Sequence, residues 1–391
     1  MTWVLLALTV GLLGFLTAEY AWHVRCREAV GLRIHVNGTR GKSSVCRLIG
    51  AGLRAAGRRT LVKTTGSAAR LIFEDGTEHR VARPGPPRVL EQLRMFRVAA
   101  RRRAEAMVVE CMALQPYLQY LSERQIVRAH VAVITNVRAD HLDVMGPDVD
   151  GVAMALAGVV PSGGTLVTRQ SPYDAFFRKA CAEQGCTLRL VDDEEVARVG
   201  PEELGRFGHI EHAENVAVAL AACEAAGAER GVALEGMYAA EPDLGALRVF
   251  RGHAPGGEWT FADGFAANDP QSSAMLWQML TERYPGRTRR LLVVNCRADR
   301  LDRSRQLGEM MAAAVRADRY VLVGAETRMA RRPAEAGGIP AEKLLDMAGA
   351  SAEAVFEELI GAVEGPALIV GMGNIKGIGE ELSARFRQAS S

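Results

Sequence analysis

Two closely spaced glycines are followed by a lysine and two serines in residues 37–44, which read Asn-Gly-Thr-Arg-Gly-Lys-Ser-Ser. The glycines give the backbone freedom and let a phosphate group approach closely. A lysine and a hydroxyl group directly behind such a loop typically contact the terminal phosphates of a nucleotide and its magnesium ion. We therefore predict an ATP-binding loop made of Asn37, Gly38, Thr39, Arg40, Gly41, Lys42, Ser43 and Ser44. Within it, Lys42 contacts the phosphates and Ser43 contacts Mg2+.

The spacing of this loop departs from the general P-loop pattern, because two residues rather than four separate Gly38 from Gly41. Its surroundings support the prediction. Residues 32–37 alternate as a strand does, and residues 45–53 place their apolar side chains on one face of a helix that opens at Ser43. The amides at the start of that helix favour an anion. An ordinary strand-to-helix turn is the alternative.

Polar side chains also follow other apolar segments that read as strands. Glu110 ends residues 106–110, Thr65 follows residues 60–62, and His141 comes shortly after residues 131–135. The carboxyl ends of parallel strands share one edge of a sheet, where ligands bind. Carboxylate and hydroxyl oxygens suit Mg2+.

We therefore predict a magnesium site made of Ser43, Thr65, Glu110 and His141. The predicted catalytic residues are Lys42, Glu110 and His141. A strand-capping acid at position 110, a polar turn at position 65 and a structural histidine are the alternatives.

The first residues of the chain form a hydrophobic segment, because residues 2–18 carry no charge. This length is at the short limit for a membrane-spanning helix. A signal peptide would require Lys or Arg before the segment, and none is present. Instead, Arg25, Arg27 and Arg33 follow the segment. We predict a single-pass anchor in a bacterial cytoplasmic membrane with the rest of the chain in the cytoplasm. A signal peptide or a buried helix is the alternative.

The length of the whole chain, 391 residues, suits two domains. Lys and Arg number 48 against 46 Asp and Glu, a balance that argues against a nucleic-acid partner. The seven cysteines form no C-x-x-C pair, which indicates reduced thiols in a cytosolic compartment. Strands alternate with helices throughout, so we expect an α/β fold with parallel-rich sheets. The predicted divisions are a membrane anchor (1–24), an ATP-binding domain (25–244) and a smaller C-terminal α/β domain (245–391).

Taken together, these segments resemble the Mur ligase superfamily of ATP-dependent amide ligases. Residues 38–43 resemble its short phosphate loop, Glu110 its magnesium glutamate, and residues 136–143 its Asn-x-x-x-Asp-His-x-Asp signature. The resemblance implies that Asn215 faces adenine and that the C-terminal domain contributes Arg248 and Asp263 to ATP binding. It also implies an acyl-phosphate intermediate, with ADP and phosphate as products. The only lysine between His141 and Asn215 is Lys179, so the carbamylated lysine of many Mur ligases is not predicted.

Within that superfamily the chain is most similar to the ligase subunits of poly-γ-glutamate synthases. The similarity is carried by residues 63–66, 110–113, 140–147, 264–269, 295–300 and 373–375. The peptidoglycan enzymes have an additional N-terminal domain, whereas only about thirty residues precede the loop here, which argues against a peptidoglycan substrate. The resemblance implies that the substrates are glutamate and a growing poly-γ-glutamate chain. It further implies small membrane subunits as partners, and a lipid bilayer as the support of the N-terminal helix.

Polar residues at strand ends of the C-terminal domain are the candidates for substrate binding. They are Asn268, Asn295, Arg297, Asp299 and Arg300. Arginine suits bidentate carboxylate binding, but the two arginines and Asp299 could equally form a structural salt-bridge network. A folate-polyglutamate type of ligase and a membrane-tethered P-loop ATPase that couples ATP to polymer assembly or export are the alternative functions.

Overall fold

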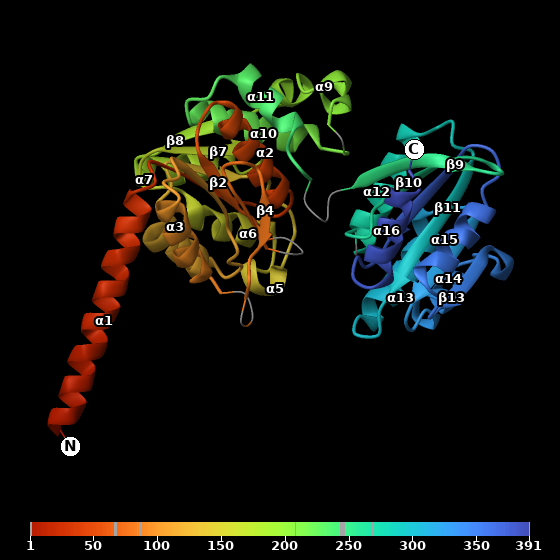
Figure 1. Cartoon of the computed structure of the whole chain (residues 1–391), viewed down its shortest axis with the longest axis horizontal. Coiled ribbons are helices and arrows are strands. Elements are labelled where there is room, and N and C mark those ends of the chain that lie inside the picture. The colour runs from red at the N-terminus through yellow and green to blue at the C-terminus, as the bar shows by residue number, and fades with distance from the viewer. Residues whose placement is uncertain are drawn as a thin grey trace. The chain divides into compact units, whose positions relative to one another are not determined.

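The computed structural model describes residues 2–65, 69–83, 85, 88–207, 209–242, 247–267 and 269–390. The chain divides into two compact units, drawn in Figure 1. Unit 1 consists of residues 1–207 and 211–244, and unit 2 of residues 208–210 and 245–391. The predicted division between residues 244 and 245 lies within residues 243–246, outside the described residues.

Unit 1 is built on an eight-stranded sheet with the order β4-β3-β2-β5-β1-β6-β7-β8. The strands are β1 (Leu32–Asn37), β2 (Thr60–Lys63), β3 (Arg70–Ile72), β4 (Glu78–Arg80), β5 (Ala106–Glu110), β6 (Val131–Ile134), β7 (Thr165–Arg169) and β8 (Thr187–Val191). The six strands from β2 to β8 in this order are parallel, which confirms the predicted parallel-rich α/β fold. The antiparallel strands β3 and β4 are additional. They have three residues each, too few for a periodic pattern to reveal them.

Helices cover both faces of this sheet (Figure 1). One face packs on α2 (Lys42–Ala55), α10 (Ala213–Ala225) and α11 (Arg230–Tyr238). The other face packs on α3 (Glu91–Arg101), α6 (Val149–Leu156) and α7 (Asp174–Gln184). Successive strand residues belong to opposite faces, so β6 is apolar throughout and β5 is apolar up to Glu110. The central strand β1 also buries the polar residues Arg33, His35 and Asn37. The shorter helical segments of unit 1 are α4 (Pro116–Leu121), η1 (Ser122–Val127), α5 (Leu142–Met145), η2 (Ala157–Val159), α8 (Asp193–Ala197) and α9 (Pro201–Gly205).

The central strand β1 lies between β5 and β6. Val36 is paired with Glu110 of β5, and Asn37 is paired with Ile134 of β6. The three strands therefore end at nearly the same level. The predicted ATP-binding loop (residues 37–44, called the phosphate-type loop below) therefore leaves the sheet beside Glu110 and beside the segment that leads to His141. This is the carboxyl edge of the sheet, where open α/β sheets bind ligands.

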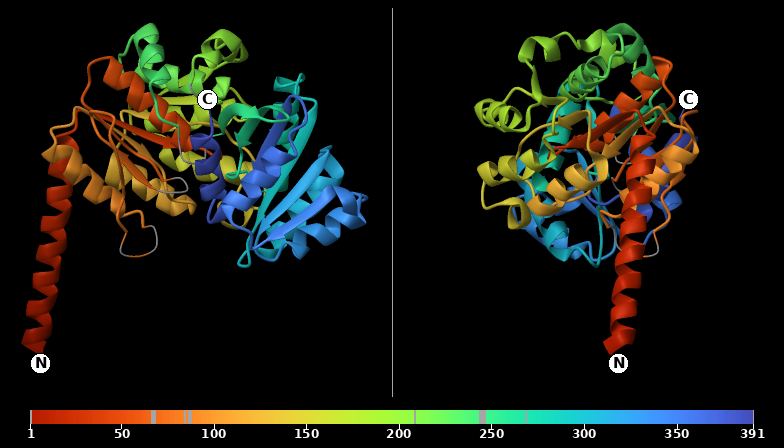
Figure 2. Two further views of the ribbon diagram at one scale, coloured as in Figure 1. Left: turned by 45° about the vertical axis from the view of Figure 1, so that its right-hand side comes forward. Right: turned by 90° about the vertical axis from the view of Figure 1, so that its left-hand side faces the viewer.

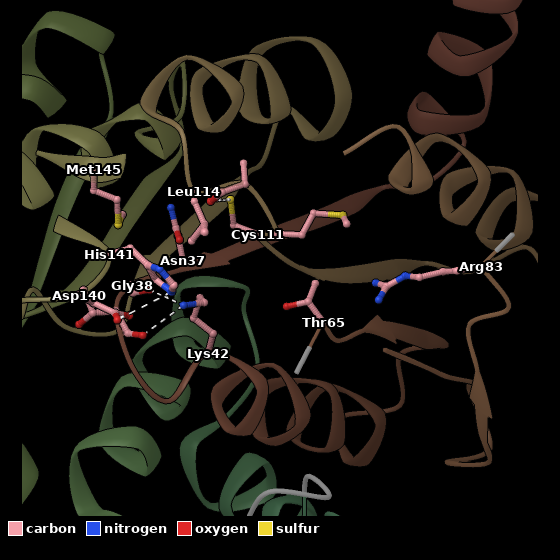
Figure 3. Close-up of a pocket in the computed structure, with 13 residues that line it drawn as sticks. Asn37, Gly38, Lys42, Thr65, Arg83, Cys111, Leu114, Asp140, His141 and Met145 are labelled. Carbon is pink, nitrogen blue, oxygen red and sulfur yellow. Dashed lines mark hydrogen bonds and ion pairs between the residues drawn. The ribbon is translucent and has the colours of Figure 1, made fainter. Parts of the chain in front are cut away.

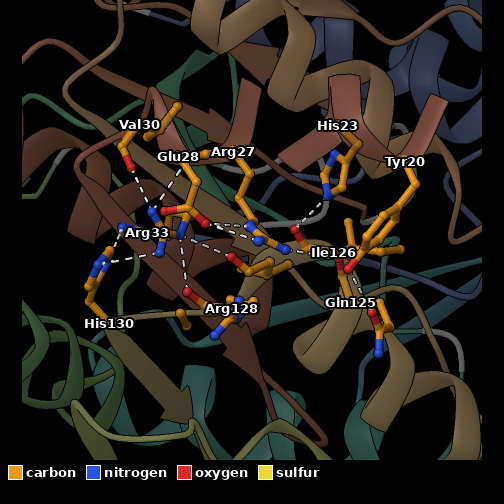
Figure 4. A network of polar contacts seen from close by, with 12 residues as sticks. Tyr20, His23, Arg27, Glu28, Val30, Arg33, Gln125, Ile126, Arg128 and His130 are labelled. Atoms are coloured by element: carbon orange, nitrogen blue, oxygen red, sulfur yellow. Dashed lines mark hydrogen bonds and ion pairs between the residues drawn. The ribbon is translucent and has the colours of Figure 1, made fainter. Parts of the chain in front are cut away.

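The N-terminal helix α1 (Thr2–Glu28) extends ten residues beyond the predicted hydrophobic segment. Its first part stands clear of the rest of unit 1 in both views of Figure 2, and it is long and apolar enough to cross a membrane. Its last turns dock on the body (Figure 4), where His23 Nε2 lies 3.0 Å from the Ile126 carbonyl oxygen and Arg27 donates to the Gln125 carbonyl at 3.1 Å. These contacts explain the polar C-terminal part of the helix.

Unit 2 contains a six-stranded sheet with the order β13-β12-β11-β14-β10-β9. The strands are β9 (Arg248–Ala254), β10 (Gly257–Asp263), β11 (Arg289–Cys296), β12 (Arg319–Gly324), β13 (Leu344–Ala348) and β14 (Ala367–Met372). All pairs are parallel except that of β9 with β10. The segments 259–262, 290–295, 320–323 and 367–370 of the sequence predict β10, β11, β12 and β14, whereas no such segment predicts β9 or β13. Both are edge strands with many partly exposed residues, so neither has a continuous apolar run.

Two layers of helices cover this second sheet. One face packs on α12 (Pro270–Arg283), α13 (Leu301–Ala314) and α14 (Arg328–Ala336), and the other on α15 (Ala352–Gly361) and α16 (Ile378–Gln388). A short turn, η3 (Ala341–Lys343), precedes β13. Each unit therefore has its own core on both faces of its sheet.

Candidate active site

The phosphate-type loop after β1 is held by the end of β6. Thr39 Oγ1 donates to Asn136 Oδ1 at 2.5 Å, and the Arg40 amide donates to the same oxygen at 3.1 Å. Thr135 Oγ1 donates to the Arg40 carbonyl at 2.6 Å. The loop therefore has a fixed shape that depends on two residues distant in the sequence. Asn136 belonged to the recognised signature, whereas no local pattern pointed to Thr135.

Glycine is required at position 41 for two structural reasons. Gly41 has φ +80°, a left-handed conformation that residues with a side chain rarely adopt. A Cβ atom there would also lie 2.5 Å from Asn215 Oδ1 at the start of α10. The Asn215 amide in turn donates to Glu211 at 2.9 Å, so the residue expected to face adenine lies directly against the loop.

Lys42 is the first residue of α2, one position earlier than the predicted helix start. Its ammonium group donates to the carbonyl oxygens of Gly38 at 2.6 Å and Thr39 at 3.2 Å. The side chain thus folds back over the loop and places its charge beside the amides at the start of α2. Loop, helix terminus and ammonium together form an environment suited to a polyphosphate.

The next residue joins the loop to β5. Ser43 Oγ donates to Glu110 Oε2 at 2.8 Å, and the Thr65 amide donates to the same oxygen at 2.6 Å. Glu110 is 3% exposed, and its Oε1 receives no hydrogen bond from the part of the chain that the structure describes. A buried carboxylate with one oxygen available beside a serine hydroxyl is a donor set that fits Mg2+.

His141 precedes α5 and has φ +45°, an unusual backbone conformation for a residue with a side chain. Such strain persists where the surrounding structure enforces it, often at functional sites. The His141 side chain is 49% exposed and lies 3.9 Å from Asp140, whose carboxylate is 3.6 Å from Arg40. His141 is therefore accessible to a ligand.

A pocket of about 400 Å³ opens beside these groups (Figure 3). Its wall includes Lys42, Thr65 and His141 among the predicted residues. Arg83 and Cys111 also line it, although the sequence did not mark either as a site residue. The pocket is thus bounded by groups suited to phosphate on one side and by an additional arginine on the other.

Asn37 differs from the other predicted loop residues in the use of its side chain. Its amide donates to Gln119 Oε1 of α4 at 2.6 Å, and the residue is 2% exposed. Gln119 itself donates to the Leu114 carbonyl at 2.8 Å. The side chain of Asn37 therefore ties β1 to α4, at a residue that also lines the pocket.

The two ATP-binding candidates of unit 2 are cross-strand neighbours. Arg248 of β9 pairs in register with Asp263 of β10. Burial raises the pKa of the Asp263 carboxyl, while a hydrogen bond from Ser383 and the charge of Arg248 act in the opposite direction. Both residues stand at the carboxyl end of β10, the side of the sheet that suits a ligand.

The substrate candidates of unit 2 are in different environments. Asn295 is 1% exposed and donates to the carbonyls of Asn374 at 2.6 Å and Lys376 at 3.1 Å, so its side chain holds the loop after β14. Arg297 binds Asp299 through two hydrogen bonds of 2.9 and 2.7 Å on the surface. Arg300 occupies the position before α13 without a capping hydrogen bond from its side chain, and Asn268 lies outside the described residues. Lys179 is an exposed residue of α7.

Comparison with known proteins places this geometry in a family. Residues 36–223 match the Mur ligase middle domain, and residues 249–389 match the poly-gamma-glutamate synthase CapB C-terminal domain. A folylpolyglutamate synthase/dihydrofolate synthase from Yersinia pestis, complexed with AMPPNP and a Mn ion, superposes with a TM-score of 0.69 at 16% identity, covering 94% of this chain and 92% of that one. MurF from Acinetobacter baumannii superposes with a TM-score of 0.64 at 16% identity, covering 94% and 79%. Fold and site define an ATP-dependent amide ligase of the Mur ligase type.

Two relatives identify the family within the Mur ligase type more specifically. The chain is 33% identical over 388 residues to PGA synthase CapB of Bacillus subtilis, covering 99% of this chain and 98% of that protein. It is 34% identical over 374 residues to capsule biosynthesis protein CapB of Bacillus anthracis, covering 94% and 80%. The chain belongs to the CapB family of poly-γ-glutamate synthases.

Proposed function

We propose that this protein lengthens γ-linked polyglutamate with ATP, through an acyl phosphate, as the catalytic subunit of a membrane-bound synthase. The observation that carries the proposal is the convergence of Lys42, the Ser43–Glu110 pair and His141 at the carboxyl ends of β1, β5 and β6. The names of the two CapB relatives supply the substrate class.

In the proposed reaction, the γ-carboxylate of one glutamyl unit attacks the γ-phosphate of ATP. ADP leaves, and an acyl phosphate forms. The amine of the second glutamyl substrate then attacks the acyl carbon, and phosphate leaves as the γ-amide bond is made. The loop amides and Lys42 hold the phosphates and offset the charge that develops on the transferring group.

Ser43, Glu110, Thr65 and His141 would hold magnesium in this site, since their oxygen and nitrogen donors border the loop. When bound, the ion supplies positive charge that neutralises the phosphate oxygens. Arg248 and Asp263 of unit 2 are the proposed contacts to the adenosine part of ATP. Arg297 and Arg300 would bind the substrate carboxylates, with Asn268, Asn295 and Asp299 as the other proposed substrate residues.

The proposed location is the bacterial cytoplasmic membrane, with α1 as the single span and both units in the cytoplasm. The support is the apolar first part of α1 and the arginines that follow it. Small membrane subunits of the synthase are the proposed partners.

The testing experiment uses the full chain in detergent with Mg2+ and ATP, with and without glutamate and a short γ-glutamyl primer. ADP release and primer mass are measured together. ADP release that requires glutamate and accompanies γ-amide extension supports the proposal. Equal ADP release without glutamate favours the coupling ATPase, and extension of a folate substrate alone favours the folate type of ligase.

A second measurement tests the first half-reaction alone, for the case that the protein completes the ligation only together with its partner subunits. ATP labelled with 18O in the β,γ-bridge is incubated with a carboxyl donor but without an amine. Scrambling of the label reports reversible acyl-phosphate formation. Absence of both scrambling and ADP release, in protein that binds Mg-ATP, would contradict the proposal.

A further inference from the structure

A cluster of charged side chains lies at the wall of the pocket across from Lys42. Lys63, at the end of β2, has a completely buried side chain, and its ammonium lies 2.9 Å from Glu91 Oε1. Arg83 Nε lies 2.5 Å from Glu91 Oε2, and its Nη2 donates to Glu91 Oε1 at 3.2 Å. One carboxylate thus serves two cations, and the three-residue cluster carries one unit of net positive charge.

Burial is expensive for an ionised side chain unless it is paired. Burial lowers the pKa of Lys63, while Glu91 opposes this effect. For Glu91, burial acts to raise the pKa, but Arg83 and Lys63 outweigh it and lower the pKa. Glu91 is also the first residue of α3, where the helix favours negative charge. The carboxylate therefore stays ionised and holds both cations in place.

Arg83 is the member of the cluster that reaches the pocket. Its side chain is 23% exposed, and Figure 3 shows its guanidinium directed toward Thr65 and the pocket interior. Nε and Nη2 are engaged with Glu91, whereas Nη1 makes no hydrogen bond within the described part of the chain. A guanidinium with a free edge in a pocket is well suited to a planar anion, because it can donate two parallel hydrogen bonds.

We propose that Arg83 binds the α-carboxylate of the glutamyl unit whose γ-carboxylate is phosphorylated, with Lys63 and Glu91 as positioning residues. This inference rests on the proposed function. Each glutamyl unit has two carboxylates, and the γ-linked product keeps the α-carboxylate free. A subsite for that group in the pocket that contains Lys42 directs the γ-carboxylate toward the phosphates. Arg83 is thereby a determinant of γ-linkage.

The test compares Arg83→Met with the full-length wild-type protein in the ADP-release assay. The variant keeps the buried Lys63–Glu91 pair, so no unpaired charge is left in the core. We expect the KM for the carboxyl donor to rise about 10- to 100-fold, the loss typical of a charge-assisted hydrogen bond, while the KM for ATP stays within about twofold. Arg83→Lys restores part of the affinity, because it keeps the charge but not the planar geometry.

A donor without the α-carboxylate makes the test specific. The probes are 4-aminobutyrate and a primer that ends in 4-aminobutyrate, which keep the reacting carboxylate. Wild-type protein prefers the glutamyl donor, and Arg83→Met loses about tenfold or more of that preference. Lys63→Met raises the KM for the carboxyl donor without changing the KM for ATP, because Glu91 then neutralises the charge of Arg83.

The matched control is Arg102→Met. Arg102 also binds a carboxylate through its guanidinium, with Nη2 at 2.7 Å from Glu74, but its side chain is 43% exposed and does not line the pocket. Its kinetics should be unchanged. A raised KM for ATP in Arg83→Met would show that the site takes a phosphate, and an unchanged donor preference would overturn the proposal. Wild-type protein that makes no γ-amide bond or acyl phosphate contradicts the proposed function instead.

Discussion

Ser43 Oγ donates a hydrogen bond of 2.8 Å to Glu110 Oε2, which joins the helix after the phosphate-type loop to the neighbouring strand β5. The two residues are 67 positions apart in the chain. The same carboxylate oxygen accepts from the Thr65 amide at the end of β2. Three strand ends thus converge on one buried carboxylate, and this arrangement connects the predicted phosphate and metal sites.

Replacement of Lys42 by Ala should lower kcat/KM for ATP about 100- to 1,000-fold, because the ammonium offsets charge that develops on the transferring phosphoryl group. The fold should persist, since Lys42 bonds only to loop carbonyls in the described structure. Glutamate-dependent ADP release and thermal unfolding measure the two effects. Lys179→Ala on the exposed surface of α7 is the control, and near-normal turnover of Lys42→Ala would contradict the assigned role.

Glu110→Gln should raise the Mg2+ concentration for half-maximal activity by about tenfold or more, because an amide oxygen lacks the charge of the carboxylate. Hydrogen bonds from Ser43 and Thr65 can still be accepted, so the loop should keep its position. Direct Mn2+ binding, followed by electron paramagnetic resonance, separates metal affinity from turnover. Glu194→Gln, at an exposed position of α8, should leave Mn2+ binding unchanged. Identical metal affinities for Glu110→Gln and wild type would exclude Glu110 as a ligand.

The stability of unit 1 should decrease at alkaline pH because of His35 in β1. Burial alone would lower the pKa of His35, but the neighbouring Cys111 and the ion pair with Glu123 outweigh it and raise the pKa to about 9. His35 Nδ1 lies 2.8 Å from Glu123 Oε2. A folded-state pKa above the unfolded value of about 6.5 means that the stabilisation is complete below pH 6.5 and is lost as pH rises through 9.

This ion pair gives a measurable pH dependence. Between pH 6.5 and 9.5 the free energy of unfolding should fall by an amount on the order of 3 kcal/mol, the equivalent of the pKa difference. Glu123→Gln should flatten the curve, whereas Glu194→Gln should leave it unchanged. Urea unfolding monitored at several pH values is the measurement. A wild-type curve that stays flat over this interval would show that His35 is neutral in the folded state.

Deletion of residues 2–18 should release the protein from membranes, because the most apolar part of α1 is removed. The docked part of the helix remains, including the ion pair of Glu19 with Arg97 and the contacts of His23 and Arg27. We therefore expect little change in the melting temperature. Fractionation of cells at high salt measures the location. A truncated protein that stays in the membrane fraction would indicate that another surface or a partner provides the attachment.

The sequence determined the local elements of the site. The loop and its helix, the alternating strand β1, the apolar strands β5 and β6, and the polar residues that end or follow them result from short-range patterns. The N-terminal apolar segment was also evident, although the helix continues to Glu28 where it docks on the body. Because parallel strands end at one edge, the strand pattern alone indicated that Lys42, Ser43, Glu110 and His141 would be neighbours.

The tertiary structure decided how the side chains are used, since their partners are far apart in the chain. Asn37 donates its side-chain amide to Gln119, and Asn295 is buried against the loop at Asn374. Thr135 fixes the loop from β6, a contact that depends on the register of two strands. The cluster of Lys63, Arg83 and Glu91 exists only because β2, the segment after β4 and α3 meet at the pocket. Charge pairing of this kind is a property of three-dimensional proximity, which no local pattern records.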